Sequence, residues 1–569
     1  MGYILNFTIN MNFICNHLTL ETIFLIPIAA VGLAAGVFAP RYLEHEHGKT
    51  RFWLFFLLTL AAMCGVVLCP GKLPFLLAWE IMGLASAGLV AFENTGKSAR
   101  NATWIYLLAC HAGAVSLMLG GFLLEKPACA IAAFALAIAG FGLKIGFPPF
   151  HVWLPEAHPA APAPASAVMS GAMIPLGFYG LLRFLPPSPV ANLHETAGIV
   201  LLLLGVAGAF GGILFALPQT NLKKLLAFSS VENMGIISIG FALAALANEG
   251  EIAALASFGA LCHVVNHSLL KGALFLGAGT VLRQTGTLNQ DHLGGLLRRM
   301  KATGSLFTLN AMGLAGLPPF AGFIGELFIY VAALKCLVAG NGTLAACGFT
   351  ALVTLALSGG IAAATYLKAI GATFLGEPRS AAAQNATEAT KSMVAAQAFL
   401  FACSLIAMPL EIFIFERLNP QFTQFHGYLA AICIFAFLVA VFLAIRLLAC
   451  PRGRISPVVP TWDCGYRQPT ARMAWTATAM SQPLAEVFRS ILRPRSHLIA
   501  FKNHPENPSD AAFATETDDL ALAGMWRPLF NRFARLFQLA HFLQNGSIHF
   551  YILLMIIAVA ILVAGSIIL

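Results

Sequence analysis

Long apolar stretches that contain ionisable residues constrain this chain more than any other feature of its sequence. An α-helix needs about 20 mainly apolar residues to cross a bilayer, and many stretches here reach that length. A charged side chain at mid-bilayer costs ~2.5–3.5 kcal/mol on insertion scales, so such residues are usually functional. We therefore expect that the ionisable residues in or beside these stretches move ions or protons. They are Glu80, His111, Lys144, His263, His267, Lys271 and Glu326.

The composition indicates a polytopic membrane protein. Of the 569 residues, 59% are hydrophobic and 10% are charged, whereas a soluble enzyme carries about 25% charged residues. The net charge of +9 falls in short loops between apolar stretches, which is typical of cytoplasmic membrane loops and not of a nucleic-acid groove. The cysteines form no C-x-x-C pair, so we expect no metal site and no cofactor in this chain.

Fourteen segments are long and apolar enough to be predicted as membrane spans. The stretch 303–340 is too long for one straight helix and is interrupted by GLPPFAG at 316–322, so it is either two crossings or one broken helix. The predicted spans lie near residues 20–39, 52–69, 73–92, 101–122, 127–148, 166–186, 194–216, 225–248, 253–281, 303–340, 343–370, 393–413, 427–449 and 549–568.

Basic residues distinguish the two sides of the membrane. The loops after the first, third, seventh and ninth spans are basic, whereas the loop after the eighth span is acidic. We therefore place the N-terminus outside an inner cell membrane and the basic loops in the cytoplasm. The basic segment after residue 449 lies on the same side only if 303–340 is a single crossing, which favours a helix broken at 317–321.

The fifth span is interrupted as well, because Lys144 is followed by the proline-rich sequence FPPFHVWLP at 147–155. The two broken spans are the fifth and the tenth, and an offset of five spans reverses the orientation. We therefore predict an antiporter-like core at 52–370 made of two inverted five-helix repeats, 52–186 and 194–370. Broken helices at matching positions of inverted repeats mark the ion site in many transporters.

Four further regions flank this core. They are an N-terminal span and loop (1–51), accessory helices (371–449), a polar cytoplasmic or interfacial segment (450–548) and a C-terminal transmembrane helix (549–569). Arginines and phenylalanines at helical spacing between 525 and 542 indicate either a helix in the membrane interface or a solvated loop that packs on a partner. The predicted fold class is an all-α polytopic membrane protein of about 14 transmembrane helices, two of them broken, with inverted repeats and a C-terminal interfacial helix.

The candidate residues have structural alternatives. His263, His267 and Lys271 share one helix face at i, i+4 and i+8, which suits a proton relay but also helix–helix hydrogen bonding. A metal site there lacks an acidic partner. Glu80 and Lys144 form either a proton switch or a static ion pair, and His111 is either a relay member or a packing histidine.

Other ionisable residues are weaker candidates. Glu232 is expected near a helix start, where it stabilises the helix dipole. Lys223 and Lys224 are expected to set the topology. His151 and His158 are expected near the cytoplasmic end of the broken helix, as proton-uptake groups or as ordinary loop residues.

Several motifs resemble the antiporter-like membrane subunits shared by respiratory complex I, Mrp-type cation/proton antiporters and membrane-bound hydrogenases. The motifs are LLAWEIMGLAS (76–86), GLKIGFPPFHVWLPEAHP (142–159), LKKLLAFSSVENMG (222–235), HVVNHSLLKGALFLGAGT (263–280) and GLPPFAGFIGEL (316–327). The segments TWDCGYRQPTARMAWTATAMSQPL (461–484) and LQNGSIHFYI (543–552) are similar to the branch of hydrogenase-4 component B and formate hydrogenlyase subunit 3.

The resemblance implies roles for the matching residues. Glu80 and Lys144 match the family's switchable ion pair, and His111 matches a polar position of the next helix. The face of His263, His267 and Lys271 matches the central relay, and Glu326 matches the end of the half-channel in the second broken helix.

The chain departs from the family at three places. Pro175 stands where the family usually has a lysine, Asn221 replaces an aspartate, and we expect about two N-terminal helices of the family to be absent. Because proline neither holds nor passes a proton, Pro175 argues against a complete proton path.

The expected function is that of a proton-translocating membrane subunit of a hydrogenase-4/formate hydrogenlyase-type or complex-I-like oxidoreductase complex. The chain itself is expected to do no redox chemistry, so its status as an enzyme stays open. Its expected partners are other membrane subunits and a peripheral iron–sulfur or hydrogenase-like arm in a hetero-oligomer, with no nucleic acid. The alternatives are a subunit of an Mrp-type cation/proton antiporter and a membrane anchor that does not pump.

Overall fold

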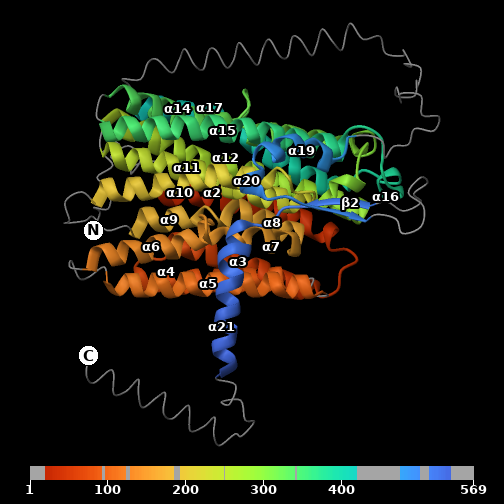
Figure 1. Cartoon of the computed structure of the whole chain (residues 1–569), viewed down its shortest axis with the longest axis horizontal. Helices are drawn as coiled ribbons and strands as arrows, with labels where there is room; N and C mark the ends of the chain where they lie inside the picture. Colours follow the sequence, from red (N-terminus) through yellow and green to blue (C-terminus); the bar gives the residue numbers. More distant parts are fainter. Residues whose placement is uncertain are drawn as a thin grey trace, which may run out of the picture. The chain divides into compact units, whose positions relative to one another are not determined.

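A computed structural model of the chain describes residues 19–92, 96–123, 129–184, 193–248, 250–339, 342–418, 475–499 and 512–539. The chain divides into two compact units, Met1–Thr517 and Asp518–Leu569, which are described in turn. In the described part of the first unit, 12 helices are long and apolar enough to cross a membrane. They lie side by side in one bundle (Figure 1).

These helices confirm the twelve spans predicted between residues 20 and 413, either as single helices or as pairs of half-helices. The predicted spans at 427–449 and 549–568 lie outside the described residues, so the total of about 14 is not tested. In chain order the spans are α2 (Leu20–Tyr42), α3 (Lys49–Leu68), α4 (Lys72–Val90), α5 (Lys97–Leu123), α6 (Ala130–Ile145) with α7 (Leu154–Ala160), α8 (Ala163–Val168) with α9 (Leu176–Phe184), α10 (Leu193–Ala216), α11 (Leu222–Ala247), α12 (Gly250–Thr285), α13 (Lys301–Leu314) with α14 (Ala321–Val338), α15 (Gly342–Phe374) and α17 (Lys391–Leu418).

The fifth span is broken where the sequence predicts it. Helix α6 ends at Ile145 because Gly146 adopts a left-handed conformation (φ 81°), and a Cβ there would lie 2.1 Å from Leu154 Cδ1. The chain continues through a short 3-10 helix, η2 (Phe150–Trp153), into α7. Trp153 Nε1 donates a 2.7 Å hydrogen bond to Leu143 O, which anchors the break to the end of α6.

The tenth span is broken in the same manner. Helix α13 ends at Leu314, Gly316 is left-handed (φ 68°), and α14 begins at Ala321. A Cβ on Gly316 would lie 2.7 Å from Glu326 Oε2, so the glycine leaves room for this carboxylate beside the break. The predicted break at 317–321 is confirmed.

A third interruption occurs in the sixth span. Between α8 and α9 the chain forms a π-helical turn, η3 (Met169–Met173), in which Ile174 N bonds to Met169 O at 3.1 Å. Pro175 follows directly and has no N–H to continue the helical pattern. The sixth span is therefore interrupted next to Pro175, in addition to the two predicted breaks.

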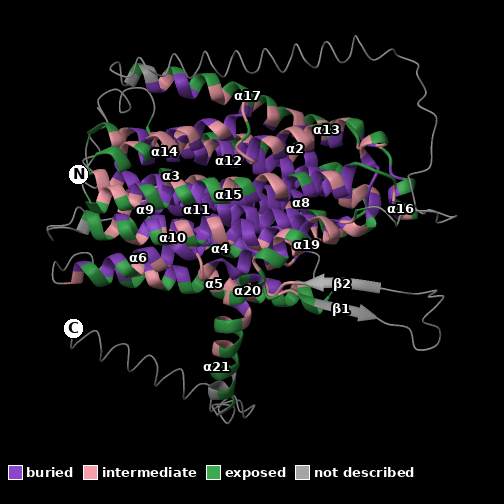
Figure 2. Cartoon of the chain, turned by 45° about the horizontal axis from the view of Figure 1, so that its top comes forward, coloured by how far each residue is buried: buried purple, intermediate pink, exposed green. Residues whose placement is uncertain are grey.

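Helix α12 lies at the centre of the bundle. It packs against α2, α8, α11, α13, α14 and α17, and most of its side chains are buried (Figure 2). Its neighbour α11 lies very close to α10, because a Cβ on Gly212 would reach Glu232 N at 2.4 Å. Small residues permit such close helix packing in membranes.

The described helices and strands of the first unit outside the spans are short. Asp291 accepts hydrogen bonds from Thr478 N (3.1 Å) and Thr478 Oγ1 (2.6 Å), which holds the start of α19. Strands β1 and β2 pair antiparallel with Arg495 opposite Glu516, a small ribbon that the sequence analysis did not predict. The elements are η4 (Gln290–His292), η5 (Leu296–Arg298), α16 (Ala381–Gln384), α19 (Ala477–Val487), α20 (Arg489–Leu492), β1 (Arg495–Ile499) and β2 (Ala512–Glu516).

The second unit contains the π-helical turn η7 (Leu522–Trp526) and helix α21 (Arg527–Leu539). The Asp519 carboxylate accepts hydrogen bonds from Ala521 N (2.8 Å) and Leu522 N (3.3 Å) at the start of this segment. The predicted Arg/Phe-rich helix is therefore present. Its remaining residues, from 540 onward, lie outside the described part.

Candidate ion-translocation site

Glu80 on α4 is paired with His111 on α5. The distance from Glu80 Oε1 to His111 Nδ1 is 3.3 Å, and the His111 side chain is half-exposed on the isolated chain. The second carboxylate oxygen, Glu80 Oε2, is buried and has no hydrogen-bond partner among the described residues. The predicted ionisable residues from Glu80 to Glu326, here called the axis, thus begin at the edge of the bundle, with one carboxylate oxygen available for a proton.

Lys144, in the last turn of α6, is buried and does not contact Glu80. Its Nζ lies 3.4 Å from Tyr106 Oη and 3.5 Å from Cys110 Sγ, and it stands 5.9 Å from the centre of the Trp79 ring. A cation–π contact stabilises an ammonium group where water is excluded. A small cavity of ≈ 10 Å³ adjoins the lysine, at the lower limit of the space that one water molecule needs. The ion pair that the family resemblance implies is therefore open in this structure.

The predicted relay lies on α12 and points into the bundle. His263 Nε2 is 3.0 Å from Asn233 Oδ1, whereas His263 Nδ1 and both ring nitrogens of His267 have no partner in the described part of the chain. Lys271 Nζ donates to Leu226 O at 2.9 Å and to Ser229 Oγ. Buried polar atoms without partners are rare, so this face carries several nitrogens able to accept or donate a proton.

Glu232 belongs to this cluster, although the sequence analysis discounted it. The expectation that it begins a helix is wrong, because α11 starts ten residues earlier at Leu222 and Glu232 is fully buried in its middle. Its carboxylate interacts electrostatically with Lys271 and Glu326. The missed signal was the apolar sequence on both sides of Glu232, the same signal that identified the other candidates.

Glu326 on α14 is the last member of the cluster and lies beside the second break. Helices α12 and α14 are in close contact there, because a Cβ on Gly325 of α14 would lie 2.8 Å from the Cβ and the amide nitrogen of His263 on α12. Glu326 is buried and faces the glycine of the break, Gly316. The structure therefore brings together Glu232, His263, His267, Lys271 and Glu326, all from the second predicted repeat.

Serine hydroxyls connect this cluster to the first repeat. Ser170 Oγ in η3 lies 2.8 Å from Ser230 Oγ on α11, and the neighbouring Ser229 contacts Lys271. At the last residue of η3, Met173 Sδ lies 3.9 Å from Lys144 Nζ. Hydroxyls both donate and accept hydrogen bonds, so this contact offers a connection where Pro175 replaces the family's lysine.

Three weaker candidates are buried, against expectation. His158 lies in α7, has two ring nitrogens without a partner in the described chain, and interacts electrostatically with Lys223 and Lys271. Lys223 is buried and donates to Ala161 O at 2.7 Å, so it is more than a surface charge that sets topology. His151 is also buried, in η2. None of the three is an ordinary loop residue.

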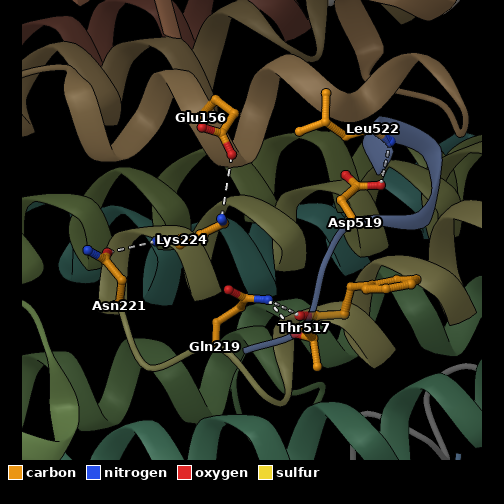
Figure 3. A network of polar contacts seen from close by, with 8 residues as sticks. Glu156, Gln219, Asn221, Lys224, Thr517, Asp519 and Leu522 are labelled. Atoms are coloured by element: carbon orange, nitrogen blue, oxygen red, sulfur yellow. Dashed lines mark hydrogen bonds and ion pairs between the residues drawn. The ribbon is translucent and has the colours of Figure 1, made fainter. Parts of the chain in front are cut away.

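The neighbouring Lys224 and Asn221 lie partly exposed at the surface of the bundle. Lys224 Nζ lies 3.5 Å from Glu156 Oε1, and Asn221 Oδ1 accepts a 3.1 Å hydrogen bond from Lys224 N (Figure 3). Asn221 is therefore the N-cap of α11. Because asparagine caps a helix about as well as aspartate, the departure from the family at this position leaves the local structure intact.

Comparison with known proteins agrees with this arrangement. Residues 72–354 match the family described as NADH:quinone oxidoreductase/Mrp antiporter, transmembrane. The chain is 30% identical to hydrogenase-4 component B of Escherichia coli (strain K12), over 96% of this chain and 88% of the relative. It is 31% identical to formate hydrogenlyase subunit 3 of the same organism, over 84% of this chain and 81% of the relative.

A solved structure shares the fold. A chain of the membrane-bound sulfane sulfur reductase, an archaeal respiratory membrane complex, superposes with a TM-score of 0.71. The superposition covers 96% of the present chain and 88% of that chain, at 23% sequence identity. At that identity the likeness shows the architecture of the bundle alone.

Proposed function

Because this chain belongs to the family of antiporter-like membrane subunits of complex I, Mrp antiporters and membrane-bound hydrogenases, we propose that it translocates protons within a respiratory membrane complex. The relatives are components of hydrogenase-4 and formate hydrogenlyase. The chain is a multi-span membrane protein, and we place it among further membrane subunits with a peripheral iron–sulfur or hydrogenase-like arm. Electron transfer in that arm drives the proton movement.

The observation that carries the proposal is the buried cluster around Lys271. Two carboxylates, two histidines and a lysine converge there inside a membrane bundle, where each of them alone is costly. Their electrostatic coupling means that a change in the protonation of one group alters the proton affinity of its neighbours. Such a cluster can receive a proton at one end and release it at the other.

At the other end of the axis, Glu80 and Lys144 control when a proton is bound and released. A carboxylate that approaches a buried lysine favours the protonated lysine, and its withdrawal favours the neutral form. Glu80 stays with His111 in the open arrangement. In this proposal, electron transfer in the peripheral arm drives the switching step, in which Glu80 moves from His111 toward Lys144.

The two predicted inverted repeats, 52–186 and 194–370, remain part of the proposal and are supported by a pair of matching contacts. Arg183, on the last helix of the first repeat, donates to Val67 O (3.3 Å) and Cys69 O (2.6 Å) at the end of α3. Lys368, on the last helix of the second repeat, donates to Leu217 O (2.5 Å) and to Gln219 O at the end of α10. In each repeat a cation on the fifth helix caps the end of the first.

The orientation follows the basic loops. We place the N-terminus outside and the loops after α2, α4, α10 and α12 in the cytoplasm, with the segment 450–548 on the same side. In this orientation the Arg183 contact lies at the outer surface and the Lys368 contact at the inner surface. Helix α21 lies in the interface, because it combines arginines with phenylalanines along its length.

The test is proton uptake into inverted vesicles that hold the whole complex, driven by its electron donor. Wild type is compared with Lys144→Ala and Glu80→Gln, and native gels check assembly. We expect both variants to lose uptake while the complex remains assembled. The matched control is Lys335→Ala, which removes a partly exposed lysine paired with Glu251 outside the axis and is expected to leave uptake unchanged.

Two alternatives give different results in this experiment. A membrane anchor that does not pump predicts full uptake in both axis variants. An Mrp-type antiporter, which the same family includes, predicts that uptake is coupled to an opposing Na⁺ gradient and needs no electron donor. The Ser170–Ser230 contact favours the pumping subunit over the anchor, because it connects the two halves past Pro175.

A further inference from the structure

A buried carboxylate lies on α17, outside both predicted repeats. Glu411 is 8% exposed, whereas the adjacent Leu410 is 51% exposed and Phe413 is 54% exposed. Helix α17 thus turns an apolar face outward and this one carboxylate inward. It packs against α2, α12, α13 and α14, which places Glu411 beside the second broken helix.

The partners of Glu411 lie on α12. Glu411 Oε2 accepts a 3.0 Å hydrogen bond from Asn266 Nδ2, and the carboxylate interacts electrostatically with the Cys262 thiol. Cys262 and Asn266 are one helical turn apart and directly precede His263 and His267 in the sequence. The face of α12 that holds Glu411 is therefore adjacent to the face that carries the relay.

Asn266 also ties this carboxylate to the break. Its Nδ2 donates a 2.9 Å hydrogen bond to Ala321 O, and Ala321 is the first residue of α14. One amide group therefore joins Glu411 to the point where the second half of the broken helix begins. A change in the charge of Glu411 acts on the hydrogen bond that fixes this point.

Two acceptors in this pocket are unpaired. Glu411 Oε1 and Asn266 Oδ1 are buried and have no hydrogen-bond partner in the ranges that the structure describes. An unpaired buried acceptor is unfavourable, because it has lost its hydrogen bonds to water without gaining others. Because both atoms are acceptors, the pocket favours a donor, which a proton bound to Glu411 supplies.

We propose that Glu411 is a proton-loading site on α17, a lateral branch of the relay at the second break. The site rests on the proposed function, because its proton comes from the α12 histidines. In the loading step an N–H bond of a protonated histidine breaks and an O–H bond of Glu411 forms, so that one proton moves and no electrons are transferred. Loading neutralises Glu411 and weakens its hold on Asn266, which couples the proton to the position of α14.

Proton uptake by the complete complex in inverted vesicles tests the site. Glu411→Gln keeps the shape of the side chain and removes the titratable group, so we expect a loss of uptake in an assembled complex. Glu411→Asp retains a carboxylate and is expected to restore part of the uptake. The control is Ser404→Ala, a buried residue of α17 whose hydroxyl donates to Phe401 O within the same helix, and it is expected to behave as wild type.

A second measurement covers the case in which Glu411→Gln does not assemble. Dicyclohexylcarbodiimide modifies protonated carboxyl groups in membranes, and mass spectrometry of the labelled wild-type complex locates the modified residues. We expect Glu411 to be labelled. Wild-type uptake in assembled Glu411→Gln, or an unlabelled Glu411 in a complex whose Glu326 is labelled, overturns the proposal.

The Lys144 and Glu80 variants separate this inference from the proposed function. If they abolish uptake while Glu411→Gln does not, the pumping function stands and the lateral branch is wrong. If neither they nor Glu411→Gln change uptake, both proposals are wrong.

Discussion

The hydroxyl of Ser170 lies 2.8 Å from the hydroxyl of Ser230, which joins the π-helical turn η3 to helix α11. Ser170 belongs to the sixth span and Ser230 to the eighth, so this hydrogen bond crosses from the first predicted repeat to the second. It lies between the surroundings of Lys144 and those of Lys271. Pro175 removes the expected lysine from this region, and a serine pair occupies the junction.

Removal of either hydroxyl is expected to interrupt this junction. Ser170→Ala and Ser230→Ala each delete one partner of a buried hydrogen bond, which costs about 1 kcal/mol of stability and leaves the fold intact. We expect both variants to lower proton uptake in vesicles by similar amounts, and the double variant to be no worse than either single one. The control is Ser257→Ala, whose hydroxyl bonds to Ala253 O within its own helix. Unchanged uptake in both variants would show that protons do not pass this point.

Neutralisation of Glu232 is expected to affect both stability and transport. Glu232→Gln removes a buried carboxylate that interacts electrostatically with Lys271, so we expect a loss of stability. The double variant Glu232→Gln with Lys271→Met removes both charges, so we expect the melting temperature to recover while uptake stays lost. Thermal unfolding of the purified complex and vesicle uptake separate the two effects. Recovery of uptake in the double variant would contradict a transport role for the pair.

The contacts made by Arg183 and Lys368 are expected to contribute similar amounts to the free energy of unfolding. In the proposed orientation they lie at opposite membrane surfaces. Each cation donates to carbonyl oxygens at a helix end, and hydrogen bonds to charged groups contribute about 1.5–3 kcal/mol. Arg183→Met and Lys368→Met should therefore destabilise the protein by similar amounts. Hydrogen exchange should rise at the end of α3 in the first variant and at the end of α10 in the second. A change at both ends in one variant would argue against two independent repeats.

Two neighbouring glycines on α10 are expected to respond very differently to alanine. A Cβ on Gly212 would lie 2.4 Å from Glu232 N, whereas a Cβ on Gly211 meets nothing within 4 Å. Gly212→Ala must therefore push α10 away from α11, and overpacking of this kind costs about 1–3 kcal/mol. We expect reduced assembly on native gels and reduced uptake for Gly212→Ala alone. Equal behaviour of the two variants would mean that the helices are not in backbone contact.

The start of α19 is expected to depend on Asp291. Asp291→Ala removes the acceptor of two hydrogen bonds from Thr478, and the loss of a helix cap costs about 1 kcal/mol. Limited proteolysis should therefore cut near residue 478 faster in Asp291→Ala than in wild type. Asp291→Asn, which keeps one acceptor oxygen, should lie between them. Uptake should not change, because Asp291 lies outside the membrane spans.

The two breaks and the relay face could be predicted because their signals are local. Glycine and proline interrupt a helix wherever they stand, so residues near 146–149 and 316–319 revealed both breaks. The 3.6-residue period alone placed His263, His267 and Lys271 on one face. The small ribbon of β1 and β2 was missed, because its strands come together across a long connection and carry no hairpin signal.

Membrane class, the twelve spans and the candidate ionisable residues other than Glu232 and Glu411 were predicted from the sequence by itself, because hydrophobicity and helical period are properties of neighbouring residues. Only the tertiary structure decided which charges meet. Asn266 and Glu411 are 145 positions apart, and Ser170 and Ser230 are 60 apart, so their contacts exist only after the helices have packed. Likewise, packing left Glu80 with His111 and apart from Lys144, since the position of α5 relative to α4 and α6 sets which partner each side chain reaches.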